Sequence, residues 1–219
     1  SYHVLGKHTD FFGAYWHEDQ TGMVRYAPYD EKVGKKIWIW GLSRQGMIWE
    51  KMLTDTDGQY AEIQSGRLFN QNAVGSSLTP FKHLGFVPHG TDKWTEYWYP
   101  VNQTKGMVVA NASAALNIKW ENGWLKWYCS PVAFFTDEME IKLDEKSLLK
   151  TKIDAKPLQT LSDSIKIQKP SGKLSIALLQ QQLEWSSDPQ FKSLSRPLDA
   201  PKPFDWTSAD GLAIHTRPC

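Results

Sequence analysis

Strict alternation of side-chain types marks the clearest strand in this chain. Residues 36–41 read Lys-Ile-Trp-Ile-Trp-Gly. In a strand, successive side chains point to opposite faces, so Trp38 and Trp40 share one face while Ile37 and Ile39 share the other. The pattern predicts a half-buried β-strand with an aromatic face.

Two further strands are predicted directly after it. Residues 47–53 follow Gly46, and residues 59–64 follow the sequence Asp57-Gly58, which is a strong β-hairpin signal. The alternation in the later strand places Tyr60, Glu62 and Gln64 on one face. A carboxylate and an amide in mid-strand must face water, a charge or a ligand, because burial without partners is costly.

The remaining pattern extends the β-structure along the chain. Strands are predicted at 94–99, 107–120, 124–129 and 131–142, with a stop at Pro100, a hairpin turn at Asn122-Gly123 and no helical period before residue 140. Beyond residue 140, where tryptophan becomes scarce, short strands are predicted at 148–154, 164–168 and 173–184. We therefore predict an all-β, antiparallel sandwich in residues 1–140, a small β-sandwich-like appendage in 141–187, and a Pro-rich linker and tail in 188–219.

Composition removes several classes of function. The chain of 219 residues carries 25 basic and 24 acidic residues, a formal net charge of +1, without a like-charged block, so we expect no nucleic-acid partner. Its apolar runs are shorter than the roughly 20 residues of a membrane-spanning helix. Cys129 and Cys219 could form a bridge, but two cysteines do not define a compartment.

The eleven tryptophans are the unusual feature of the composition. They fit a large aromatic core, and they fit equally a cleft in which indole rings stack on the apolar faces of sugars. Polar residues between 43 and 71 could supply the hydrogen bonds, because sugar hydroxyls both donate and accept. We propose Glu62 as the candidate catalytic carboxylate. The candidate substrate-binding residues are Trp38, Trp40, Arg44, Gln45, Trp49, Tyr60, Gln64, Arg67, Glu96 and Trp98.

A plain solvent-exposed sheet face explains the same alternation, and both interpretations stay open. His83, His89, Asp92 and Glu96 bring imidazole and carboxylate groups together near a predicted loop, yet such histidines are usually ordinary surface residues. No metal-binding spacing, phosphate loop or nucleophile motif is found in the sequence, and we expect no cofactor.

Several blocks of the sequence resemble a known family, named domain of unknown function 5107. The resemblance extends over roughly residues 10–206. It rests on residues 34–41, Leu53-Thr54-Asp55, Asp57-Gly58, Tyr60, Glu62-Ile63-Gln64, Gly66-Arg67, Asn70-Gln71 and Trp98-Tyr99-Pro100-Val101. It implies an exported bacterial protein, periplasmic or extracellular, in which a galactose-mutarotase-like supersandwich precedes tetratricopeptide repeats. Residues 1–140 would then be the C-terminal portion of that supersandwich, with the N-terminal sheet and the repeats as expected partners.

Three functions follow from these observations. The first is a sugar site of enzymatic origin that hydrolyses or epimerises a glycan, with Glu62 as acid or base and Asp55, Asp57 or Glu96 as a second carboxylate. The second is a non-catalytic carbohydrate-binding module that uses the same aromatic face. The third is a structural interaction domain whose tryptophans are all core. An oligosaccharide or polysaccharide is the expected ligand of the first two.

Overall fold

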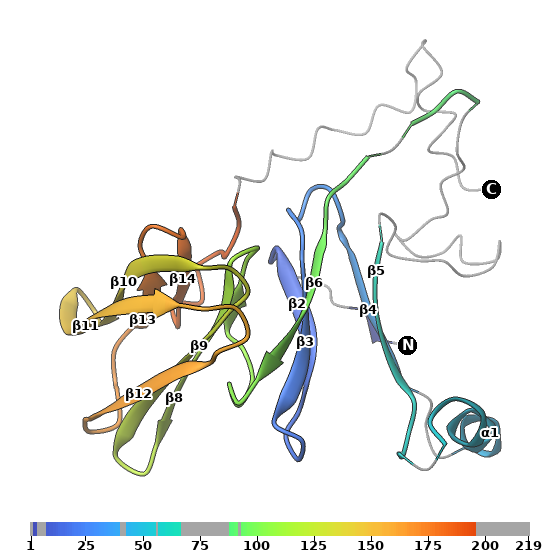
Figure 1. The fold of residues 1–219 in the computed structure, drawn as a ribbon, viewed down its shortest axis with the longest axis horizontal. Coiled ribbons are helices and arrows are strands. Elements are labelled where there is room, and N and C mark those ends of the chain that lie inside the picture. Colours follow the sequence, from blue (N-terminus) through green and yellow to red (C-terminus); the bar gives the residue numbers. More distant parts are fainter. Residues whose placement is uncertain are drawn as a thin grey trace. The chain divides into compact units, whose positions relative to one another are not determined.

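The computed structural model describes residues 2–3, 8–39, 43–55, 57–66, 88–91 and 93–195. Most of these residues lie in strands, and every strand pair is antiparallel, which confirms the predicted all-β fold class (Figure 1). The chain divides into two compact units. The first unit comprises residues 1–7, 30–94 and 196–219, and the second unit comprises 8–29 and 95–195. Among the described residues, no helix is both long and apolar enough to span a membrane.

Two four-stranded sheets in the second unit form a β-sandwich. One sheet has the order β12-β9-β8-β7, formed by Leu161–Lys166, Trp124–Pro131, Ala114–Glu121 and Val109–Ala110. The other has the order β11-β10-β13-β14, formed by Lys146–Ala155, Phe135–Leu143, Leu174–Leu178 and Leu183–Ser186.

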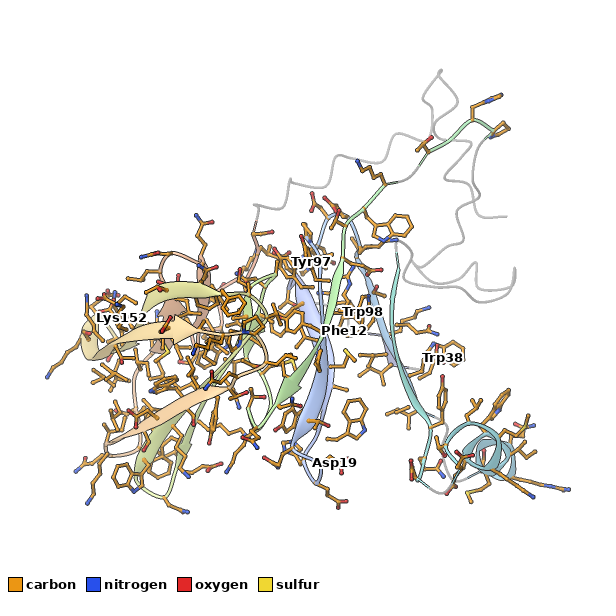
Figure 2. All side chains as sticks on the ribbon, in the orientation of Figure 1. Phe12, Asp19, Trp38, Tyr97, Trp98 and Lys152 are labelled. Carbon is orange, nitrogen blue, oxygen red and sulfur yellow. The ribbon has the colours of Figure 1, made fainter. Side chains whose placement is uncertain are left out.

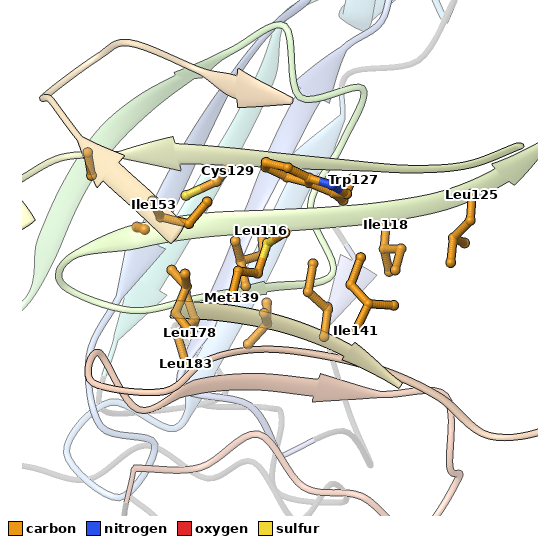
Figure 3. Packing of buried hydrophobic residues seen from close by; sticks show 14 residues of the cluster. Leu116, Ile118, Leu125, Trp127, Cys129, Met139, Ile141, Ile153, Leu178 and Leu183 are labelled. Atoms are coloured by element: carbon orange, nitrogen blue, oxygen red, sulfur yellow. The ribbon is translucent and has the colours of Figure 1, made fainter. Parts of the chain in front are cut away.

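The core of the sandwich lies between these two sheets. Figure 3 shows Leu116 and Cys129 from one sheet and Met139, Ile141 and Leu178 from the other meeting in the space between the strands. All five are fully buried. Each buried aliphatic side chain of this size stabilises the fold by about 1.5–3 kcal/mol, so the alternate apolar positions of β8, β9 and β10 hold the two sheets together.

The sandwich includes strands from both sides of residue 140. β10 pairs with β11 along its whole length and with β13 from Met139 to Leu143. The division expected between residues 140 and 141 therefore falls inside a single strand. Local composition changes there, but the hydrogen-bonded sheet and its core continue across the change.

The hairpin predicted at Asn122-Gly123 is confirmed. These residues join β8 to β9, and Glu121 pairs directly with Trp124. Asn122 has φ 52° and Gly123 φ 83°, the left-handed backbone that both central residues of a type I′ turn require.

A third sheet in the second unit has the order β2-β3-β6, formed by Phe11–Trp16, Thr21–Tyr26 and Tyr97–Asn102. It packs on the sandwich through Val24, Tyr99 and Val101, which meet Ala110 and Ala115. The predicted strand stop at Pro100 is wrong, because β6 continues through Pro100 to Asn102. β6 is an edge strand of this sheet. Proline is tolerated in an edge strand because the backbone N–H that it lacks can lie on the side with no neighbouring strand.

Asp10 anchors the described part of the predicted linker. Its backbone N–H donates to Ser193 O at 3.4 Å, and its carboxylate accepts from the backbone N–H of Ser195. Residues 188–195 accordingly lie against the second unit without forming a helix or strand. Residues 196–219, the rest of the predicted linker and tail, lie outside the described residues.

The first unit contains a three-stranded sheet with the order β1-β4-β5, formed by Tyr2–His3, Gly34–Ile39 and Ala61–Gly66. The predicted strand at 36–41 corresponds to β4, and the predicted strand at 59–64 corresponds to β5, each shifted by two residues. The pair β4–β5 forms the face on which the candidate site lies.

Helix α1, Arg44–Leu53, replaces the strand predicted at 47–53, and that prediction is wrong. Ser43 caps the helix, since its Oγ accepts from the backbone N–H of Gly46 at 3.1 Å. The segment consists largely of good helix formers, and its apolar residues at 47–49 and 52–53 recur at helical spacing, although Gly46 alone is buried. Ser43 is a helix N-cap residue type, a local signal for the helix that the alternation pattern does not take into account.

The hairpin predicted at Asp57-Gly58 is also wrong. The segment instead connects the end of α1 to β5. The Thr54 hydroxyl donates to Glu50 O at 2.8 Å and contacts Gly58 O at 2.6 Å, and Gly58 has φ 94°. Asp-Gly is a turn signal of this kind because glycine accepts positive φ without strain, whichever elements the turn joins.

Candidate functional site

The register of β4 and β5 brings an indole and a carboxylate together on one sheet face. Trp38 lies opposite Glu62, and Lys36 lies opposite Gln64. Directly opposed residues of an antiparallel pair project to the same face with Cβ atoms about 4.5–5.5 Å apart. We call this face, with Lys36, Trp38, Tyr60, Glu62 and Gln64, the Glu62 face; Figure 2 labels Trp38 on it.

Hydrogen bonds confirm the predicted common direction of Tyr60, Glu62 and Gln64. The Tyr60 hydroxyl donates to Glu62 Oε2 at 3.1 Å, and the Gln64 amide Nε2 donates to Glu62 Oε1. Both carboxylate oxygens are therefore oriented, one by Tyr60, which directly precedes β5, and the other by Gln64 on β5. Tyr60, Glu62 and Gln64 are each half-buried, so the carboxylate keeps lone pairs for further donors.

Lys36 is the residue of this face that the sequence reasoning missed. It is only 4% exposed, and within the described part of the chain its ammonium forms neither a hydrogen bond nor a direct ion pair. Burial lowers the pKa of Lys36, and the negative charge of Glu62 opposes that shift. Its position two residues before Trp38 in an alternating strand was the available signal for its place on this face.

The carboxylate of Glu62 also affects the pKa of Tyr60. Its pKa is raised, first by desolvation and then by the hydrogen bond to Glu62 and the charge of Glu62. The phenol therefore stays protonated at neutral pH and acts as a donor. The Glu62 face thus offers an indole ring, an oriented carboxylate acceptor and a nearby cation, the groups that a sugar ring with hydroxyls can contact.

Helix α1 carries three more of the predicted residues. Arg44 and Gln45 are exposed in its first turn, and Trp49 is half-buried in its middle. No hydrogen bond or ion pair between described residues joins Arg44 or Gln45 to Glu62. The helix instead contacts the approach to β5, because Gln59 Nε2 donates to Glu50 Oε2 at 2.7 Å. Trp40 and Arg67 lie outside the described residues.

Glu96 and Trp98 belong to the second unit, where they form a separate group around Arg25. The guanidinium Nε of Arg25 donates to Glu96 Oε2 at 2.9 Å, and the Arg25 side chain is fully buried. Phe12 on β2 and Trp98 on β6 lie opposite Arg25 on either side in the sheet, and Figure 2 labels both. The structure therefore assigns these two predicted residues to a different unit from Glu62.

The other carboxylates proposed as a second member are not held beside Glu62 by any contact between described residues. Asp55 and Asp57 are exposed in the turn after α1, and Asp55 has φ 53°. Of the predicted histidine group, His89 is exposed, while His83 and Asp92 lie outside the described residues. Beside them, Lys32 Nζ lies 3.1 Å from the ring centroid of Trp94, a cation–π contact.

Comparison with protein families identifies the part of the chain that carries this face. Residues 1–101 match the model of the family described as domain of unknown function, DUF5107. Residues 1–101 belong to this family. The DUF5107 match includes all three strands of the first unit and β2, β3 and nearly all of β6 in the second. The resemblance expected over residues 10–206 is confirmed as far as residue 101 and stays a prediction beyond it. No solved structure matches the chain.

Proposed function

We propose that this chain binds a carbohydrate through the Glu62 face, as part of an exported bacterial protein of the periplasm or cell exterior. The observation that carries the proposal is the pairing of Trp38 with Glu62 across β4 and β5. An indole beside an oriented carboxylate suits a pyranose, whose apolar face stacks on the ring while its equatorial hydroxyls donate to the carboxylate. The galactose-mutarotase-like supersandwich remains the architecture that we propose for the wider family domain.

The described residues of the Glu62 face supply the stacking and hydrogen-bonding groups that carbohydrate binding requires. Hydrolysis by the usual mechanism needs two carboxyl groups about 5–9.5 Å apart. Glu96 is engaged by Arg25 in the second unit, and Asp55 and Asp57 lie in an exposed turn. Hydrolysis or epimerisation is therefore to be assayed with any glycan that binds. Glu62→Gln is the variant that removes the acid–base group.

Isothermal titration with a panel of neutral oligosaccharides tests the proposal. Heat from at least one glycan is expected with the intact chain, and Trp38→Ala should weaken that binding roughly tenfold, which corresponds to about 1.4 kcal/mol. Trp124→Ala is the matched control, since Trp124 is 41% exposed at the β8–β9 hairpin in the second unit. Absence of binding across the panel, or equal losses in both variants, would contradict the proposal.

The exposed apolar side chains of α1 favour the interaction module as a second candidate. Met47, Ile48, Met52 and Leu53 are each 45% exposed or more. Several exposed large apolar residues on one short helix are typical of a surface that contacts another protein. Sedimentation of the chain and of a variant with all four residues changed to Gln would test this function. Concentration-dependent association lost in the variant would support it, and monomers in both cases would exclude self-association.

A further inference from the structure

The Glu62 face carries one positive and one negative charge among its described residues. Lys36 supplies the cation and Glu62 the anion, while Tyr60, Gln64 and Trp38 are neutral at pH 7. Lys35 is the next residue along β4, and strand alternation directs it to the opposite face. The described residues of this face therefore carry no net charge.

Among the described residues, Glu62 is the charge that acts on Lys36. The hydrogen bonds to Glu62 come from the phenol of Tyr60 and the amide of Gln64, which carry no charge. Lys36 is 4% exposed as a residue and forms no direct ion pair with any described residue, and the negative charge of Glu62 opposes the lowering of its pKa by burial. Removing either charge would leave the other uncompensated in a partly desolvated setting, where screening by water is reduced.

We propose that the balanced charges of Lys36 and Glu62 make this site selective for an uncharged sugar over its uronate. The inference rests on the proposed carbohydrate binding and deepens it by naming the substrate class. A carboxylate added to the ligand would meet repulsion from Glu62 that the ammonium of Lys36 only offsets, and it would lose part of its own hydration on binding. A neutral hydroxyl, in contrast, donates to Glu62 without disturbing the balance.

The inference makes a reciprocal prediction for two charge variants. In Glu62→Gln the positive charge of Lys36 is uncompensated, so uronates should gain affinity relative to neutral sugars. In Lys36→Gln the carboxylate stands alone, so the preference for neutral sugars should increase. Each change should shift the ratio of the two dissociation constants by roughly tenfold or more, the effect of one unit charge at short range in a partly exposed site.

The experiment compares galactan, mannan and glucan oligosaccharides with the same oligosaccharides oxidised at C6 to uronates. Dissociation constants are measured by isothermal titration at low salt and about pH 8, where an ordinary histidine is neutral. The expected results are tighter binding of a neutral glycan by the native chain and opposite shifts of the ratio in the two variants.

The outcomes separate the inference from the function on which it rests. If the native chain binds no glycan of either kind, the proposed function fails. If it binds uronates as tightly as neutral glycans, or if neither variant changes the ratio, the function stands and the charge-balance inference is overturned. Circular dichroism and thermal unfolding establish that each variant folds. Should Glu62→Gln not fold, the ratio in Lys36→Gln still decides the inference.

Discussion

Trp38 on β4 lies directly opposite Glu62 on β5 in the antiparallel register of the first unit. The pairing matters because an indole ring can stack on the apolar face of a sugar while a carboxylate accepts from its hydroxyls. The Glu62 oxygens are already oriented by Tyr60 and Gln64, so the carboxylate has a defined direction before any ligand arrives. A preorganised acceptor loses less entropy on binding than a mobile one.

Removing the Glu62 charge should lower the pKa of Lys36 further. Burial already lowers this pKa, and the attraction of Glu62 limits the shift. In Glu62→Gln that support is lost, so the ammonium should release its proton at lower pH than in the native chain. Titration of the lysine side-chain nitrogen by NMR would measure both values, with Lys152→Gln, an exposed change on β11, as control. An unchanged or increased pKa would contradict the coupling of the two residues.

The lowered pKa of Lys36 predicts how the stability of the chain depends on pH. Because the folded-state pKa of Lys36 lies below its unfolded value, the unfolded chain binds more protons between the two values. This residue therefore makes the chain more stable as pH rises from the folded pKa of Lys36 toward the ordinary lysine value of about 10.4, and costs stability below that window. Lys36→Met should remove this part of the pH dependence. Urea unfolding of both chains across the window would detect the difference.

Gly13 should resist replacement by any larger residue. A Cβ atom at this position would lie 2.0 Å from the backbone carbonyl oxygen of Met23 on the neighbouring strand, so β2 and β3 would have to separate. Gly13→Ala should lower the free energy of unfolding by about 2–4 kcal/mol. Gly172→Ala is the control, because the nearest atoms there belong to the side chain of Asp144, which can rotate away. Equal losses of stability in the two variants would be evidence against the tight β2–β3 approach.

Asp137 should stabilise the sandwich through the loop between β13 and β14. Its carboxylate accepts from the backbone N–H groups of Gln180 at 3.0 Å and Gln181 at 3.0 Å, and the residue is buried. Asp137→Asn turns one acceptor into a donor facing N–H groups, which should cost about 1–3 kcal/mol of unfolding free energy. Asp163→Asn makes the same change at an exposed carboxylate that accepts from Ser164 N at 2.7 Å. That control should lose little stability in thermal unfolding.

Cys129 should be unreactive in the folded chain. Burial in the sandwich core raises the pKa of this thiol to about 12, and the charge of Asp137 adds to the shift. The thiolate, which is the reactive form, is therefore scarce at pH 8. In a Cys219→Ser background, a thiol reagent should modify Cys129 only after addition of denaturant. Rapid modification under native conditions would show that the core around β9 opens readily.

Three residues of the Glu62 face show which part of the site the sequence predicts. Tyr60, Glu62 and Gln64 were assigned to one face correctly because strand alternation is local and depends only on the backbone repeat of two. Local alternation places Lys36 on the same face as Trp38, but that this face is shared with Glu62 and Gln64 depends on the register between β4 and β5. That register is set by pairing across a connection that contains α1, and no short-range pattern in the sequence encodes it.

The same contrast holds for the whole chain. By itself the sequence determined the alternating faces of β4 and β5, the Asn122-Gly123 turn and the predominance of strands, because these follow from local sterics and side-chain period. Only the tertiary structure decided that residues 44–53 are a helix, that β10 joins strands from both sides of residue 140, and that Glu96 pairs with Arg25. Those features depend on contacts between distant segments, where the free energy of packing and pairing overrides local preference.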